Sequence, residues 1–277
     1  MSVFNEKKGN GGAAVDPEAF RARPNRRTTP RLELTPLTLD EFALYLSDVD
    51  ALAQELRLAE PPSEPDAETR AAFNWLFENA LALDAASLCW STLWAAISRS
   101  ENRVVGFLCF KGPPRPLFDF LETAPNFKID AATAGNDATV EPVVDANARS
   151  GAEENMRAAE SVRAAVNERA ETGENAASAA VVEIGYGVDK AFRGRGFATE
   201  AVGALVDWGR EREDVGAIWA ETLTANLPSR RVLEKCGFRR RGESTDALFW
   251  RVDVSERTDR ADETGKTGVL IFDFLSR

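Results

Sequence analysis

The chain has 277 residues, of which 44% are hydrophobic and 29% charged, and these values are ordinary for a soluble globular protein. Its net charge of −11 disfavours a nucleic-acid partner, because an acidic surface repels phosphates, and it would attract a cationic partner such as an amine. Histidine is absent, which excludes a Ser-His-Asp triad, a Cys-His pair and a histidine-ligated metal. Proton transfer must therefore use carboxylates, hydroxyls, amines, thiols or water.

Residues 1–30 lack apolar periodicity and are rich in Gly, Pro and Arg, so we expect a flexible N-terminal arm. Residues 31–49 predict a strand, a turn and a helix. Thr38 is placed to cap this helix, and Glu41 three residues later completes a capping box.

A second helix is predicted over residues 67–83, where apolar residues recur at helical spacing. These residues are Phe73, Leu76, Phe77 and Leu81. Residues 90–99 and 103–110 predict two strands joined by a hairpin turn. Cys89, Cys109 and Cys236 form no CxxC motif, so we expect small buried residues and no metal site.

Residues 112–179 have a different composition, poor in large apolar residues and dominated in their second half by Ala, Glu, Asn and Arg. Such a segment cannot bury a core of its own. We interpret it as a low-complexity insertion within one domain of residues 31–254, because the strands on either side need each other.

Order returns after the insertion. Strands are predicted at 180–188, 216–223, 237–244 and 247–254, and a further one at 268–275 in the C-terminal segment 255–277. Helices are predicted at 196–212 and 226–236. Asn226 is the expected N-cap of the second helix and Gly237 follows its end. The order of elements predicts an α/β domain around a mixed sheet.

The turn between the strand at 180–188 and the next helix has the composition of an anion site. The first N–H groups of a helix have no internal partner, and the helix dipole favours negative charge there. Gly194 and Gly196 allow a phosphate to approach the backbone, and Arg193 and Arg195 add charged hydrogen-bond donors. A diphosphate is the natural ligand, although a plain tight turn would also use two glycines.

Three cofactor classes carry a diphosphate. The dinucleotide pattern G-x-G-x-x-G is only partly met, and no Walker A Gly-Lys-Ser/Thr sequence is present. The third class, coenzyme A, matches closely: EIGYGVDKAFRGRGFATEA resembles the acetyl-CoA motif R/Q-x-x-G-x-G/A of the GNAT superfamily of N-acetyltransferases.

A second motif, NLPSRRVLEKCGF, resembles that of the RimJ/RimL-like branch, which acetylates N-terminal amines of ribosomal proteins and has relatives with small-molecule substrates. The resemblance covers residues 31–254 without the insertion. It implies the GNAT fold, an α+β arrangement whose mixed, mostly antiparallel sheet of six to seven strands has flanking helices and a splayed strand pair.

The resemblance also implies how acetyl-CoA would bind. Pantetheine would lie in the splayed gap, bonded to backbone near Tyr186 and Val188, with Asn226 contacting its arm. Backbone N–H groups would hold the diphosphate, namely those of Arg193, Gly194, Arg195, Gly196, Phe197, Ala198 and Thr199.

In this family an amine attacks the thioester directly, so no covalent enzyme intermediate is implied. Glu183 is the candidate base, directly or through a water, although a carboxylate there would also suit positioning of the substrate. Leu233 stands where many members carry a tyrosine that protonates the thiolate, which is normal in the RimJ/RimL branch. Ser229 is the substitute acid, and its alternative role is that of a first-turn serine satisfying backbone. The oxyanion would bind the backbone N–H near Val188.

The acceptor is expected to be a primary amine, either a protein N-terminal α-amine or a small molecule of the antibiotic or polyamine type. A non-catalytic acyl-CoA-binding regulatory module is the alternative from another class, and the insertion could recruit a partner. We further expect a cytoplasmic monomer or homodimer with no nucleic-acid or membrane partner, since the sequence has no signal peptide and no apolar run long enough to cross a bilayer.

Overall fold

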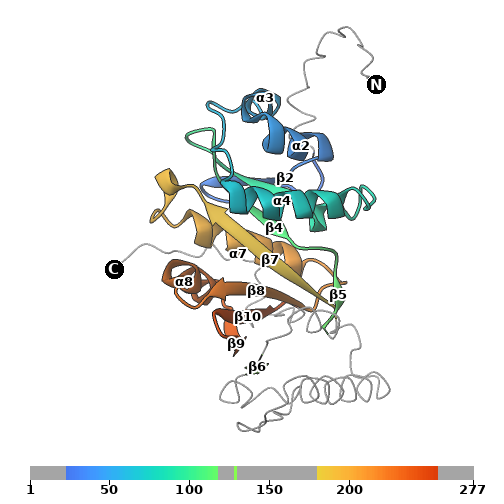
Figure 1. Cartoon of the computed structure of the whole chain (residues 1–277), viewed down its shortest axis with the longest axis vertical. Coiled ribbons are helices and arrows are strands. Elements are labelled where there is room, and N and C mark those ends of the chain that lie inside the picture. The colour runs from blue at the N-terminus through green and yellow to red at the C-terminus, as the bar shows by residue number, and fades with distance from the viewer. Residues whose placement is uncertain (1–22, 118–127, 130–179, 255–277) are drawn as a thin grey trace, which may run out of the picture.

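The computed structural model describes residues 23–117, 128–129 and 180–254 (Figure 1). Within these ranges ten strands form one sheet in the order β1-β2-β3-β4-β7-β8-β10-β9-β6, and β5 also pairs with β7. Seven of them are five residues or longer: β2 (Leu32–Pro36), β3 (Leu93–Ser98), β4 (Arg103–Phe110), β7 (Ala180–Val188), β8 (Ala217–Leu223), β9 (Arg239–Glu243) and β10 (Ala247–Asp253). The two-residue strands are β1 (Arg27–Thr28), β5 (Arg115–Pro116) and β6 (Lys128–Ile129).

The helices of the described residues flank this sheet. They are α2 (Leu39–Ser47), α3 (Val49–Glu55), α4 (Ala67–Ala80), α7 (Phe197–Arg210) and α8 (Leu227–Lys235), with 3-10 turns η1 (Leu88–Trp90) and η3 (Lys190–Phe192). The predicted mixed α/β fold with a mostly antiparallel sheet is confirmed, because among the described strand pairs β7 and β8 alone run parallel. Sequence patterns missed α3 and both 3-10 turns, which are short.

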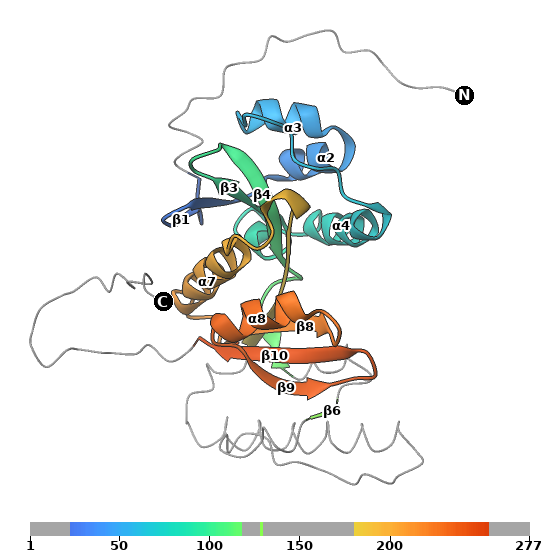
Figure 2. The ribbon, with the colours of Figure 1, turned by 90° about the vertical axis from the view of Figure 1, so that its left-hand side faces the viewer.

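The two faces of the central strands carry separate cores. Figure 2 shows α7 and α4 on opposite sides of β4. Leu108 and Ile184 pack with the α7 face that includes Trp208, whereas Phe107 packs with Phe42 and other residues under α2 and α4. Strand alternation explains this division, since neighbouring residues of one strand point to opposite faces.

Local signals explain why the helices begin where they do. The capping box at α2 is confirmed: the Thr38 side chain accepts from the backbone of Glu41, whose carboxylate accepts from the backbone of Thr38. Asn226 caps α8 as predicted, accepting from Ser229 N–H at 3.2 Å, and Gly237 follows α8 at a φ of +84°. Phe197, Ala201, Leu205 and Trp208 recur at helical spacing along α7, and all four are buried.

The flexible arm was predicted to extend to residue 30, but residues 23–30 belong to the folded domain. Arg27–Thr28 forms β1 against β2, and Arg23 donates to Glu41 at 2.6 Å from one of its guanidinium nitrogens. Residues 1–22 lie outside the described residues. Most of the predicted insertion also lies outside the described residues. Its two described strands both join the sheet, because β5 pairs with β7 and β6 pairs with β9. The strand predicted at 268–275 also lies outside the described residues.

Candidate functional site

The parallel pair β7 and β8 opens partway along its length. Their register runs from Val181↔Ala217 to Glu183↔Trp219 and stops there, while β7 continues to Val188 beside β4 and β8 continues to Leu223 beside β10. Figure 1 shows β7 crossing diagonally between the upper strands and the β8–β10 layer. The predicted splay of this strand pair is therefore present, with Glu183 at its base.

The open side of β7 presents backbone groups to the gap. Lys111 N–H donates to Glu183 C=O at 2.9 Å and Asp189 N–H to Val105 C=O at 2.9 Å, so the odd-numbered residues of β7 direct their polar groups to β4. The even-numbered residues point the other way, as Ala180 does when its carbonyl accepts from Gly216 N–H. Beyond the last β8 partner, the backbone groups of Ile184, Tyr186 and Val188 thus face the gap.

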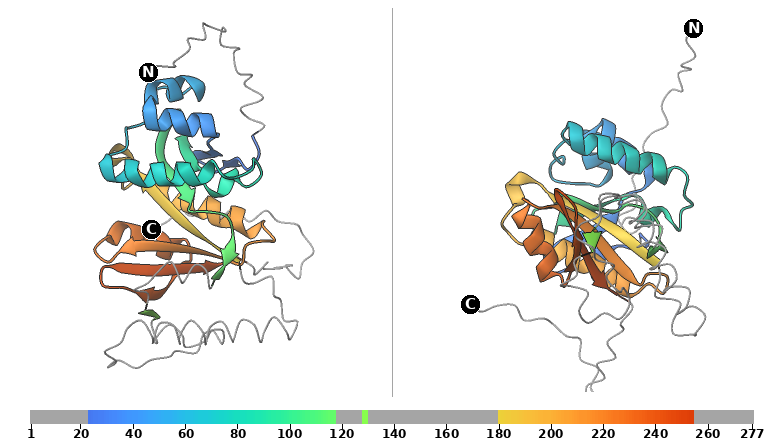
Figure 3. Two further views of the ribbon diagram at one scale, coloured as in Figure 1. Left: turned by 45° about the vertical axis from the view of Figure 1, so that its right-hand side comes forward. Right: turned by 60° about the horizontal axis from the view of Figure 1, so that its bottom comes forward.

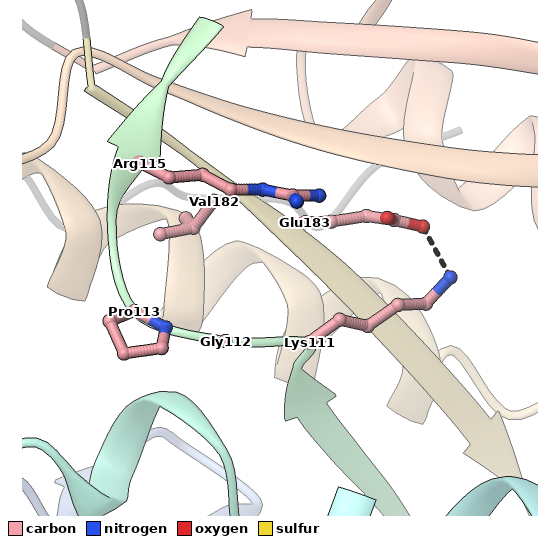
Figure 4. Close-up of a pocket in the computed structure, with 6 residues that line it drawn as sticks. All are labelled: Lys111, Gly112, Pro113, Arg115, Val182 and Glu183. Atoms are coloured by element: carbon pink, nitrogen blue, oxygen red, sulfur yellow. Dashed lines mark hydrogen bonds and ion pairs between the residues drawn. The ribbon is translucent and has the colours of Figure 1, made fainter. Parts of the chain in front are cut away.

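Glu183 points to the face opposite α7 and meets Lys111. The two side chains form an ion pair (Figure 4), and Glu183 retains 13% of its side-chain exposure against 40% for Lys111. Burial works to lower the pKa of the Lys111 ammonium, but Glu183, with a smaller contribution from Glu221, raises it by more, so this pKa lies above the ordinary lysine value. The ammonium therefore stays charged.

The pair borders a small hollow between β7 and the segment that follows β4, lined by Lys111, Gly112, Pro113, Arg115, Val182 and Glu183. Glu221 of β8 belongs to the same electrostatic cluster: burial raises its pKa, Lys111 lowers it, and Glu183 raises it further. Burial likewise raises the pKa of the Cys109 thiol to about 11, so it is no nucleophile at neutral pH. Here the carboxylates of Glu183 and Glu221 lie with two cationic side chains, Lys111 and Arg115, so an ammonium group already occupies a position beside Glu183.

The glycine turn has the geometry that an anion site requires. Gly194 and Gly196 have φ values of +75° and +81°, which side-chain-bearing residues rarely adopt. Gly196 is the N-cap residue of α7, and no side chain caps that helix end. A β-carbon at Gly194 would meet no atom within 4 Å. The N–H groups of the first turn, from Phe197 to Thr199, are thus left for a ligand.

The two arginines of the turn differ in their contacts. Arg193 donates from Nε to the Val188 carbonyl at 3.0 Å, tying the turn back to the end of β7. Arg195 donates from Nη2 to Glu101 Oε1 at 2.7 Å and lies over the Phe197 ring, 4.9 Å from its centroid. Both are exposed, and Phe197 itself is core, so it can offer only its backbone.

Arg31 is a functional candidate that sequence patterns missed. Its guanidinium donates to the Arg195 carbonyl at 2.8 Å and from Nε to Glu200 Oε2 at 2.6 Å. Burial works to raise the pKa of Glu200, but hydrogen bonds from Thr29 and Arg31 outweigh it, so the pKa is lowered. This network fixes the turn to the first turn of α7. Only the fold brings residue 31 to residue 195, so no local signal could have identified it.

At the other side of the gap, α8 is linked to β7. Tyr186 O–H donates to the Ser229 carbonyl at 3.0 Å, and burial raises the pKa of this phenol to about 12. Asn226, exposed at the end of β8, uses its side-chain oxygen as the N-cap of α8. Ser229 sits in the first turn, and its backbone takes part in both contacts. Leu233, where the sequence resemblance implies a tyrosine in many members, is fully buried.

These features suit acetyl-CoA. An uncapped helix N-terminus beside two arginines matches a diphosphate, and the backbone of Tyr186 and Val188 facing a gap matches the amides of pantetheine. Among the described residues, no group of three or more Cys, Asp or Glu side chains is placed to hold a metal ion. Nor does that part of the chain contain a helix with the length and apolarity needed to cross a membrane.

Comparison with known proteins finds similarity to acetyltransferases. Residues 149–239, which include every element from β7 to α8, match a family model described as acetyltransferase (GNAT) domain. "Uncharacterized N-acetyltransferase YjdG" of Bacillus subtilis (strain 168) is 36% identical over 70 residues, which are 25% of this chain and 42% of that protein. "Probable N-acetyltransferase YjcK" of the same organism is 46% identical over 59 residues, 21% of this chain and 33% of that protein.

The matched residues therefore carry the sequence pattern of a GNAT acetyltransferase domain. The chain spans less than half the length of these curated relatives. A solved acetyltransferase (GNAT family) from Bacillus anthracis aligns with 83% of this chain and 99% of its own at 18% identity, with a TM-score of 0.40.

Proposed function

We propose that the chain is an acetyl-CoA-dependent N-acetyltransferase that moves acetyl to a primary amine by direct attack. The observation that carries the proposal is the opening of β7 from β8 after Glu183↔Trp219, with the uncapped α7 N-terminus near the wide end and a carboxylate at the narrow end. The match of residues 149–239 to the GNAT model supports it.

Acetyl-CoA supplies an activated acyl group as a thioester. In the proposed complex the first-turn N–H groups of α7 hold the diphosphate, with Arg193 and Arg195 as charged donors. The backbone of Tyr186 and Val188 orients the pantetheine, and the N–H groups that β7 turns to the gap nearer Glu183 are the donors for the negative charge that develops on the thioester oxygen. Asn226, the N-cap residue of α8, follows β8 by three residues, and in the proposed complex it would contact the pantetheine arm.

Glu183 is the proposed base. It lies at the narrow end of the gap, and its low exposure limits the water that could compete with a bound amine for the carboxylate. Ser229 is the proposed acid, and its backbone contacts with Tyr186 and Asn226 also account for its position in the first turn of α8. The thiolate can also leave without an acid, since Leu233 offers none.

The acceptor is an amine, and we favour a protein N-terminal α-amine over a small amine on the strength of the RimJ/RimL-like motif around α8. The Glu183 carboxylate, which already pairs with an ammonium, suits either cation. A panel of amines distinguishes them: peptides with free N-termini, the same peptides blocked at the N-terminus, polyamines and aminoglycosides. Release of free thiol from acetyl-CoA is measured, with a blank that corrects for the protein's own cysteines.

The decisive experiment is calorimetric titration of acetyl-CoA into the full chain and two charge-matched variants. Arg195→Glu places a carboxylate at the proposed diphosphate site. Arg210→Glu makes the same charge change at the other end of α7, where Arg210 pairs with Asp207 at 2.6 Å. We expect Arg195→Glu to abolish binding and Arg210→Glu to retain it. If both variants bind like the wild type, the turn does not hold the diphosphate. Binding without turnover on the whole panel would favour the non-catalytic module.

A further inference from the structure

Lys111 is held against Glu183 by its backbone as well as its side chain. It follows β4 directly, and its N–H donates to the Glu183 carbonyl at 2.9 Å. The side chain then runs over β7, where its Cε would lie 3.9 Å from a β-carbon at Gly185, and its Nζ meets the Glu183 carboxylate. The tight contact of such a β-carbon would be with Cys109 Sγ at 3.2 Å, whereas its distance to the lysine is that of ordinary van der Waals contact.

The position of this Nζ is the one that an acceptor nitrogen must reach. A base that acts directly has to lie within hydrogen-bond distance of the proton that it removes. The Lys111 amine already occupies that distance from Glu183, on the face of β7 away from α7, at the base of the gap (Figure 4). An external amine must displace it, and in the absence of such an amine Lys111 is itself a primary amine beside the base.

We propose that Lys111 is an internal acceptor, occupying the acceptor-amine position at Glu183 and becoming acetylated by the enzyme's own acetyl-CoA when no other amine is bound. The inference rests on the proposed function, because it uses the same base and the same acyl donor. It adds a modification site on the chain and assigns Lys111 as the competitor that an external amine has to remove.

The chemistry balances without a further reagent. Glu183 takes one proton from the Lys111 ammonium, and the neutral nitrogen forms a bond to the acetyl carbon. The carbon–sulfur bond of the thioester breaks and the second nitrogen proton is lost, so the products are N-acetyl-lysine and coenzyme A. One of the two released protons returns to the thiolate and the other goes to solvent.

The charge of Lys111 makes its acetylation diagnostic. A lysine whose pKa is raised by an ion pair has less free amine at neutral pH than an exposed lysine, so it reacts more slowly with acetyl-CoA in solution. Lys190 and Lys235 are exposed and serve as internal references for this background. Preferential labelling of Lys111 therefore requires the site to act on it.

The test incubates the full chain with trideuteroacetyl-CoA and no acceptor, followed by peptide mass spectrometry. The deuterium separates new labels from acetyl groups acquired during expression. We expect Lys111 to be labelled ahead of Lys190 and Lys235, and we expect Glu183→Gln to slow its labelling about 100-fold or more, the usual contribution of a general base. Lys111→Arg keeps the charge and should remove that label without changing the labels at the two reference lysines.

Equal labelling at all three lysines, or labelling of Lys111 that survives Glu183→Gln, would overturn the inference. Calorimetry on the same preparation separates the two levels of failure. If acetyl-CoA binds and an external amine is acetylated while Lys111 stays unlabelled, the function stands and the inference falls. If acetyl-CoA does not bind, both the proposed function and the inference fall. Should Glu183→Gln not fold, the comparison of Lys111 with the reference lysines in the wild type still decides.

Discussion

Substitution of Gly194 tests whether the turn before α7 holds a ligand or only reverses the chain. Gly194 has a φ of +75°, and a β-carbon there would meet no atom within 4 Å. Alanine therefore adds a backbone penalty and no clash. Leucine adds the same penalty, but its longer side chain also enters the open space beside the first turn of α7. The difference in acetyl-CoA affinity between the two variants therefore measures the effect of filling that space, because the backbone penalty is the same in both.

The magnitudes follow from the geometry. The left-handed conformation costs a residue with a β-carbon about 1–2 kcal/mol, so both variants should lose about that much unfolding free energy in the absence of acetyl-CoA. If the leucine side chain denies a phosphate one charged hydrogen bond of about 1.5–3 kcal/mol, its affinity falls about tenfold or more below that of the alanine variant.

The assays are urea denaturation with and without acetyl-CoA, and calorimetric titration. Gly203→Ala is the control in α7, where the β-carbon again meets nothing within 4 Å but φ is not positive. It should gain about 0.5–1 kcal/mol of unfolding free energy and bind like the wild type. Equal acetyl-CoA affinity of the leucine and alanine variants would refute the reasoning, because the open space would then not be the ligand's.

Two further substitutions test the contacts around the gap. Tyr186→Phe removes the 3.0 Å bond to the Ser229 carbonyl and should lower the unfolding free energy by about 0.5–1.5 kcal/mol. It should leave kcat unchanged, and a large fall in kcat in steady-state assays would instead give the phenol a role in proton transfer. Glu200 has a depressed pKa in the folded state, so its stabilising effect is complete above its ordinary value of 4.5 and is lost as the pH falls through the depressed value. Urea denaturation of Glu200→Gln should thus show a deficit against the wild type at pH 7 that closes in acid, and a deficit independent of pH would contradict this.

The elements around the site were predictable because their signals are local. Asn226 and Pro228 begin α8 and Gly237 ends it, all within one short stretch. The strand predicted at 180–188 has the bounds of β7, since a run of apolar residues alternates there with glycine. The mixed sheet followed from the order of such elements, and its splayed pair was expected only through the family resemblance.

The missing parts of the site depend on contacts between distant residues. Lys111 is separated from Glu183 by 72 positions and Arg31 from Arg195 by 164, so no spacing rule links them. The predicted arm extended to residue 30, which was too far, for the same reason. Arg27 reaches Glu211 across 184 positions, and composition alone made residues 23–30 resemble the preceding residues.

Strand alternation gives β7 two different faces, which is what the proposed reaction of two substrates requires. Tyr186 points to the α7 face, where it contacts α8, whereas Glu183 points to the opposite face with Lys111. Figure 3 shows β7 running diagonally from β4 to β8. The Tyr186 face and the Glu183 face of the strand meet at the edge that β7 exposes where it leaves β8. Gly187 lies on the Glu183 face, and a β-carbon there would meet nothing within 4 Å, which leaves room along that face of β7. In the proposed reaction the acyl donor therefore enters from the side of α7 and α8, and the amine meets it at the base of the gap from the side of α4.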